Sequence, residues 1–180
     1  LPAAEEFGLL LKDRVSYWRA KHAAMIVTKA ERLTSGATEP LEAHPRLAWE
    51  IIDKGSWADD EAIQDMWSGL LASSCTSQRD DGNILFVSLL ERLTVLEVRL
   101  LNNFCESAPK FISKSGLPYS EEIVVPLSDL TKITGVSDLH RLDRELDHLR
   151  SLELIDGGFT AADFAEVGTD ASIRVTPLAL

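Results

Sequence analysis

The sequence predicts a mostly α-helical protein, with an N-terminal helical bundle over residues 1–93 and a winged-helix-like α+β region over residues 94–180. Apolar residues recur at helical spacing through most of the first region. In the second region, two short helical segments joined by a tight turn precede two strand-like segments, which is the order of a winged helix. The length of 180 residues and the hydrophobic content of 45% suit one domain or two small ones.

The first region is organised around residues 56–74, where a single apolar stripe follows the helical period. Ser56 and Asp59 are alternative N-caps for this helix, and the pattern does not choose between them. Trp57 and Trp67 add large apolar area, so we expect this helix to be central to the core. The stripe consists of Ile63, Met66, Trp67, Leu70 and Leu71.

A long helix is predicted over residues 7–34, and its segment 12–32 is the locally basic part of the chain. A basic helix with interleaved aromatic residues can contact nucleic acid or a membrane surface, and the alternative is the solvated face of a packed helix. The cations considered for such a contact are Lys12, Arg14, Arg19 and Lys21. The apolar stripe of this helix consists of Phe7, Leu10, Leu11, Val15 and Trp18, and continues roughly through Ala23, Ile26 and Ala30.

Two shorter helices complete the first region. Pro45 suits the first turn of a helix that runs to about Lys54 and is ended by Gly55. Residues 83–93 are dense in leucine and other apolar residues and predict another helix.

The second region opens with a capping-box pattern, in which Thr94 caps a helix and Glu97 reaches back to it. The inward stripe of this helix carries Val98, Leu101, Phe104 and Cys105. We interpret Cys105 as a buried apolar group rather than a reactive thiol. A short strand is expected over residues 121–125.

The helix-turn-helix pattern follows. Ser128 is expected to cap a short helix that leads to a turn at Gly135, and Ser137 to cap a second helix. Residues 152–156 alternate like a strand, Gly157 and Gly158 are expected to form a turn, and residues 173–175 predict a second strand. The segment 159–172 between the two strands is acidic and longer than a tight wing.

A helix that reads DNA should offer Arg, Lys, Asn or Gln to base edges. The second helix offers Arg141 and Arg144, which remain candidate contacts. These arginines lie among carboxylates, which would repel phosphate. The spacing favours local ion pairs instead, such as Arg141 with Glu145. The carboxylates are Asp138, Asp143, Glu145 and Asp147. Packing or protein contact is therefore the favoured role of this region.

The net charge of −11 argues against a nucleic-acid binder, because phosphate contacts dominate the affinity of such proteins. The two cysteines form neither a disulfide framework nor a zinc site, so a reducing cytoplasmic location is expected. No apolar run approaches the ~20 residues of a membrane helix. The chain starts without Met and without a signal-peptide pattern, as a trimmed chain would.

No catalytic, cofactor-binding or metal-ligating residue is predicted. No nucleophile elbow or phosphate-binding glycine loop occurs, and the four histidines lack the i, i+4 spacing of a helical metal site. His140 and His148 are interpreted as surface residues. We therefore expect that the protein is not an enzyme and needs no cofactor.

Three stretches together resemble the abortive infection alpha (Abi-alpha) family of bacterial proteins. They are residues 13–21 (DRVSYWRAK), residues 57–72 (WADDEAIQDMWSGLLA) and residues 86–97 (FVSLLERLTVLE). The closing segments 152–155 and 175–178 are also similar to the family. The resemblance implies a role in limiting phage infection and carries over no catalytic residue.

The resulting hypothesis is a non-enzymatic phage-defence protein that acts through contacts with a phage protein, a host protein or a second copy of itself. One alternative is a winged-helix DNA-binding transcriptional regulator. Another is a membrane-surface protein anchored by further N-terminal sequence together with the basic helix 12–32. The sequence leaves the trigger, the partner and the oligomeric state open.

Overall fold

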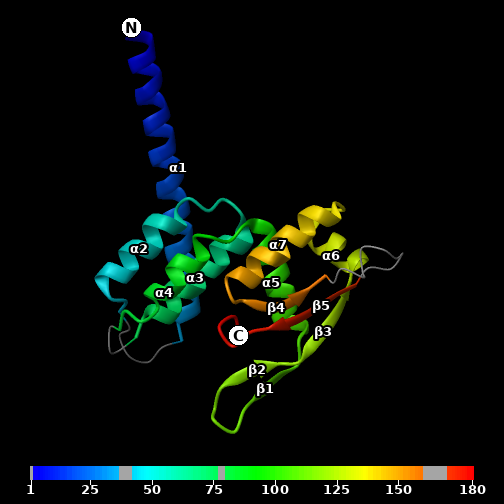
Figure 1. Cartoon of the computed structure of the whole chain (residues 1–180). Coiled ribbons are helices and arrows are strands. Elements are labelled where there is room, and N and C mark those ends of the chain that lie inside the picture. The colour runs from blue at the N-terminus through cyan, green and yellow to red at the C-terminus, as the bar shows by residue number, and fades with distance from the viewer. Residues whose placement is uncertain (1, 37–41, 77–79, 160–169) are drawn as a thin grey trace. The chain divides into compact units, whose positions relative to one another are not determined.

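The computed structural model describes residues 2–36, 42–76, 80–159 and 170–180, with side chains from residue 11 onward. The chain folds as two compact units, Leu1–Leu93 and Thr94–Leu180. The described ranges contain seven helices and five strands, so the predicted mostly α class is confirmed (Figure 1).

The first unit is built from α1 (Pro2–Thr34), α2 (Pro45–Gly55), α3 (Glu61–Ser74) and α4 (Ile84–Leu90). α1 packs mainly against α3, and α2 packs against both of these helices. α4 is shorter than the helix predicted over residues 83–93. The buried core of this unit consists of Ile26, Ala30, Leu47, Ile51, Trp67, Leu70, Leu71 and Val87.

α2 begins and ends as the sequence predicts. Pro45 occupies its first turn and Gly55 is its last residue. A Cβ atom at Gly55 would lie 2.8 Å from Ile26 Cδ1 and 3.0 Å from Trp67 Cγ. Glycine is therefore needed here for the close approach of three helices, because only a residue without a side chain leaves room for Ile26 and Trp67.

The start predicted for the central helix is wrong. α3 begins after Asp60, whose Oδ1 accepts a hydrogen bond from Ala62 N at 2.9 Å, so neither Ser56 nor Asp59 is the N-cap. Trp67 is 3% exposed, as expected of a core residue. Trp57 is 56% exposed, because it lies in the connection before α3 rather than on its buried face.

The apolar stripe predicted along α1 packs into the core only in the second half of the helix. Ile26 is buried, whereas Leu11 is 48% exposed and Val15 is 41% exposed. The first half of α1 extends beyond the other helices of the first unit, and none of them covers it (Figure 1). Leu11 and Val15 therefore belong to the part of the stripe that does not reach the core.

The second unit opens with α5 (Val95–Ser107), and the predicted capping box is confirmed. Thr94 N donates to Glu97 Oε2 at 2.7 Å, and Glu97 N donates to Thr94 Oγ1 at 3.2 Å. Val98, Leu101 and Phe104 are buried, and Cys105 is partly buried.

Two further helices follow, α6 (Leu127–Thr134) and α7 (Leu139–Ser151). The N-caps predicted for these helices, Ser128 and Ser137, are both wrong. Pro126 precedes α6 without a side-chain cap, and Asp138 caps α7 by accepting from His140 N and Arg141 N. The turn at Gly135 is confirmed, with φ of 72° in the left-handed region that glycine adopts without strain.

The main sheet of this unit is antiparallel and has the order β3-β5-β4. It is formed by β3 (Glu122–Pro126), β4 (Ile155–Gly158) and β5 (Asp170–Val175). The turn predicted at Gly157 and Gly158 is wrong, since both residues belong to β4. Gly157 has φ of 94°, and a Cβ atom there would lie 2.0 Å from Ser172 O. Of the long segment predicted between these strands, residues 160–169 lie outside the described part.

A hairpin of β1 (Lys110–Ile112) and β2 (Pro118–Ser120) lies between α5 and β3 in the chain. The sequence pattern did not predict it, because each strand has only three residues and alternation cannot be recognised over so short a run. In the second unit the hairpin extends away from the three-stranded sheet (Figure 1).

Candidate functional site

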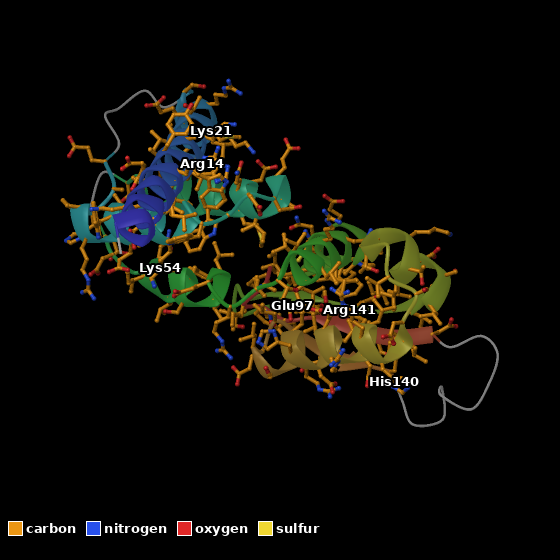
Figure 2. The ribbon with its side chains drawn as sticks, turned by 90° about the horizontal axis from the view of Figure 1, so that it is seen from above. Arg14, Lys21, Lys54, Glu97, His140 and Arg141 are labelled. Atoms are coloured by element: carbon orange, nitrogen blue, oxygen red, sulfur yellow. The ribbon has the colours of Figure 1, made fainter. Side chains whose placement is uncertain are left out.

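The cations predicted on α1 fall into two groups. Lys12, Arg14 and Lys21 are exposed, and none of them forms an ion pair with another described residue. Figure 2 shows the side chains of Arg14 and Lys21 on α1. Arg19 is partly buried and forms an ion pair with Asp53 in the first unit. The structure therefore separates Arg19 from the other three.

Arg19 binds the last turn of α2 and the start of the connection to α3. Its Nη2 donates to Asp53 Oδ1 at 2.6 Å and to Asp53 O at 2.9 Å, and its Nε donates to Ser56 Oγ at 2.9 Å. The guanidinium carbon also lies 4.5 Å from the ring centroid of Trp57. This cation–π contact and the hydrogen bonds hold the connection and its tryptophan against α1.

The arginines of α7 are exposed but lie beside carboxylates. Arg141 Nε is 3.8 Å from Glu145 Oε1, as predicted from the local pairing, and Arg150 Nη2 is 2.5 Å from Asp147 Oδ1. Arg144 is exposed. This face of α7 therefore presents mixed charge rather than a basic patch.

The interpretation of His148 as a plain surface residue was wrong. Its Nδ1 lies 2.5 Å from Oε1 of Glu97, a carboxylate whose side chain is fully buried. The same carboxylate closes the capping box of α5, so one buried group joins the start of α5 to α7. The two residues are 51 positions apart, and no local pattern pairs them.

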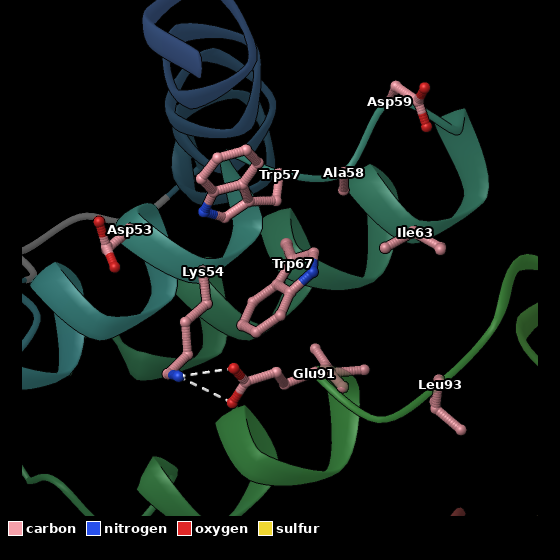
Figure 3. A pocket seen from close by; sticks show the side chains of 10 residues that line it. Asp53, Lys54, Trp57, Ala58, Asp59, Ile63, Trp67, Glu91 and Leu93 are labelled. Atoms are coloured by element: carbon pink, nitrogen blue, oxygen red, sulfur yellow. Dashed lines mark hydrogen bonds and ion pairs between the residues drawn. The ribbon is translucent and has the colours of Figure 1, made fainter. Parts of the chain in front are cut away.

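A pocket of about 390 Å³ in the first unit is the best candidate for a functional site. Its apolar lining comes from α3, α4 and the residues beside them, and its polar lining comes mainly from α2 and the connection to α3 (Figure 3). The apolar lining residues are Trp57, Ala58, Ile63, Trp67, Leu90 and Leu93, and the polar ones are Asp53, Lys54, Asp59 and Glu91.

Ion pairs fix most of the charged side chains around the pocket. Lys54 Nζ donates to Glu91 Oε1 at 2.8 Å and to Oε2 at 2.7 Å, and this hydrogen bonding raises the pKa of the Lys54 ammonium (Figure 3). Asp53 is held by Arg19. Asp59 is exposed and forms no ion pair with a described residue. With three carboxylates and one ammonium in its lining, the pocket carries negative charge.

Trp57 is the most accessible large side chain at this pocket. Besides Arg19, it contacts Trp18, with the ring centroids 6.1 Å apart and the planes inclined at 50°. Trp18 in turn packs edge-on against the buried ring of His22 at 4.2 Å. The indole is therefore held by neighbours from α1 while more than half of its surface stays open.

The lining consists of apolar side chains, three carboxylates and one ammonium group. It contains no serine, cysteine or histidine that could act as a nucleophile or a general base. Burial raises the pKa of the Cys75 and Cys105 thiols, which disfavours the reactive thiolate. In the described ranges, no group of three or more His, Cys, Asp or Glu residues could hold a metal ion.

Sequence reasoning placed Trp57 in the core and so missed its role at the pocket. A signal was present, because six positions separate Trp57 from Ile63, which places them about 120° apart around a helix at 100° per residue. Trp57 therefore lies off the apolar stripe even if the helix is extended back to it. The acidic run that follows it also marked the true helix start.

The described elements define a mostly helical protein with small antiparallel sheets. The family model for abortive infection alpha matches residues 21–168, so the chain belongs to the abortive infection alpha family. No curated protein and no solved structure matches the chain. The matched range includes the whole lining of the pocket and excludes Arg19. Within the described ranges, every helix is too short or too polar to cross a membrane.

Proposed function

We propose that this protein limits phage infection without catalysing a reaction, by binding another protein in the cytoplasm. Membership of the abortive infection alpha family supports the role in phage defence. The chemistry of the pocket supports the mode of action, since its lining offers shape, apolar area and charge, and ion pairs hold Asp53, Lys54 and Glu91.

The exposed and fixed indole of Trp57 carries the proposal. Tryptophan is enriched among the residues that contribute most to protein–protein affinity, and such residues lie in or beside well-packed pockets. Trp57 is 56% exposed, yet Arg19 and Trp18 restrain it. A side chain that is already ordered loses little conformational entropy when a partner binds, so more of the contact energy appears as affinity.

The charge around the pocket indicates what the partner presents. Trp67 and Ile63 offer apolar surface at the pocket, and Asp59 adds a carboxylate that pairs with no described residue. A partner segment with an apolar side chain next to a lysine or arginine would match both features. The partner is therefore a protein with such a segment on its surface, from the phage or from the host.

For the second unit we propose a winged-helix architecture that serves as a scaffold. The order α5, β3, α6, α7, β4, β5 and the sheet order β3-β5-β4 support this assignment. The mixed charge on α7 favours packing or protein contact over DNA reading, because its carboxylates would lie near phosphates.

A plaque assay with two matched tryptophan variants tests the proposal. Trp57→Ala should abolish protection of a bacterial host that expresses the protein, so that plaque numbers rise to those of the empty vector. Trp49→Ala is the control, because Trp49 is 70% exposed on α2 and does not line the pocket. Equal protection by wild type and Trp57→Ala, at equal protein levels, would overturn the proposal.

A further inference from the structure

The β1–β2 hairpin presents the most exposed set of apolar side chains in the described part of the second unit. Ile112 is 72% exposed, Leu117 63%, Tyr119 44% and Phe111 40%. Soluble proteins seldom keep several large apolar side chains together on a projecting element without a partner for them. The hairpin is separate from the pocket, which lies in the first unit.

The apolar side chains lie on both faces of the hairpin. Phe111 pairs with Tyr119 in the strand register, and their rings stack with centroids 5.5 Å apart at 28°. Side chains alternate along a strand, so Ile112, which pairs with Pro118, lies on the opposite face. A flat protein surface would cover only one of these faces, whereas a medium that surrounds the hairpin would cover both.

The hairpin is anchored at its base and closed at its turn. Ser120 is buried, and its Oγ donates to Val175 O at 2.9 Å and accepts from Val175 N at 3.0 Å. At the turn, Ser113 N donates to Leu117 O at 2.9 Å, and Gly116 takes the positive φ of 84°. These hydrogen bonds tie the base of the hairpin to β5 and close its turn.

The charge on the hairpin is opposite to that of the whole chain. Lys110 and Lys114 are exposed, and no Asp or Glu occurs from residue 110 to residue 120, whereas the chain carries a net charge of −11. A partner for this surface should therefore be negatively charged as well as able to accept apolar side chains.

We propose that the β1–β2 hairpin inserts into the surface of a bilayer that contains anionic phospholipid. Ile112, Leu117 and Phe111 would enter the boundary between headgroups and acyl chains. The phenol of Tyr119 suits the interfacial level, and the ammonium groups of Lys110 and Lys114 reach the phosphates while their stems remain among apolar atoms. This contact does not depend on the pocket, and the protein could bind a partner with or without it.

Vesicle sedimentation with the full chain tests the inference. The wild type should sediment with vesicles of phosphatidylcholine and phosphatidylglycerol in equal amounts, and not with phosphatidylcholine alone. Added salt should weaken this binding, because it screens the lysines. Lys110→Glu with Lys114→Glu should weaken it about thirtyfold or more, given the attraction that each cation contributes at an anionic surface.

Ile112→Asp is the apolar variant and should also abolish sedimentation. Its matched control is Leu85→Asp, since Leu85 is likewise 72% exposed but lies on α4 in the first unit. Circular dichroism would establish that both variants keep the wild-type helix content. The control should sediment like the wild type.

Four results would overturn the inference. One is a wild-type chain that does not bind the anionic vesicles even at low salt. Another is unchanged binding by both hairpin variants. A third is loss of binding only in the variant with Lys12→Glu, Arg14→Glu and Lys21→Glu, which would assign the membrane contact to α1. The fourth is hairpin-dependent binding of a labelled single-stranded DNA without vesicle binding, which would assign the hairpin to nucleic acid.

Discussion

The pocket of the first unit and the hairpin of the second unit both expose aromatic side chains, but on different supports. Trp57 rests on Arg19 and Trp18 beside the buried Trp67. Phe111 and Tyr119 stack on each other and belong to a hairpin of two short strands. An indole fixed beside a packed core suits a partner of defined shape, whereas a thin hairpin that is apolar on both faces suits a fluid medium.

The two tryptophans that line the pocket of the first unit also differ in their burial. Trp67 is part of the core and Trp57 is not, although they lie ten positions apart and line the same pocket. Substitution of each tryptophan should therefore affect the free energy of unfolding and the protection against phage to different degrees.

The largest effect is expected from Trp67→Ala. Removing a buried indole leaves a cavity, and such substitutions destabilise by ~3–5 kcal/mol. Urea unfolding followed by circular dichroism measures the change in the free energy of unfolding. A loss below ~1 kcal/mol would contradict the placement of Trp67 in the core.

Glu97→Ala should be the next most disruptive change, and it acts on the second unit. It removes the capping box of α5 and leaves His148 Nδ1 without its buried partner, so we expect a loss of about 2–3 kcal/mol. Glu97→Gln can retain the capping box and should cost less. If both variants unfold at the wild-type urea concentration, the buried carboxylate does not link α5 to α7 in solution.

Two glycines of the first unit give a matched pair with opposite signs. Gly55→Ala forces a Cβ against Ile26 and Trp67 and should destabilise by about 1–2 kcal/mol, even after the gain in helix propensity. Gly69 lies in α3 with open space at its Cβ position, so Gly69→Ala should stabilise by about 0.5–1 kcal/mol. Thermal unfolding measures both changes in stability. If the two substitutions changed it equally, the space around Gly55 would have to be large enough for a Cβ atom.

Trp57→Ala should change stability by less than about 1 kcal/mol, because the indole is mostly exposed and its deletion opens no buried cavity. This small effect on stability, together with lost protection in the plaque assay, is the outcome that distinguishes a recognition residue from a core residue. If Trp57→Ala lowered the free energy of unfolding as much as Trp67→Ala, Trp57 would have to be regarded as a core residue as well.

The smallest effect concerns the thiols. Burial raises the pKa of Cys75 and Cys105, so less thiolate is present at pH 8 than in the unfolded chain. Iodoacetamide should therefore modify the folded protein more slowly than the urea-unfolded protein, and the difference should narrow as the pH rises. Mass spectrometry after timed quenching would measure both rates, and equal rates would contradict the burial of the thiols.

Local signals in the sequence were sufficient to predict where some helices begin. Pro45 and the Thr94–Glu97 capping box fixed two helix starts, because each acts over a few residues. The caps predicted at Ser128 and Ser137 were wrong, since Ser128 lies inside α6 and the adjacent Asp138 caps α7. Several residue types compete for such positions, and composition alone does not decide between neighbours.

The candidate site depended on contacts that no local pattern contains. Arg19 reaches Asp53 and Ser56 across 34 and 37 positions, and this long-range contact determines where Trp57 lies. The hairpin was missed for a different reason, because its strands are too short for alternation and its apolar residues resemble an ordinary core segment.

Site-specific photocrosslinking in infected cells would show whether Trp57 contacts another protein during phage defence. A benzophenone side chain placed at position 57 should form one dominant crosslinked product with another protein, and the same group at position 49 should not. The expected result is that this product is formed in cells that resist the phage. If position 57 yields no product while the cells still resist infection, protection does not depend on protein contact at the pocket.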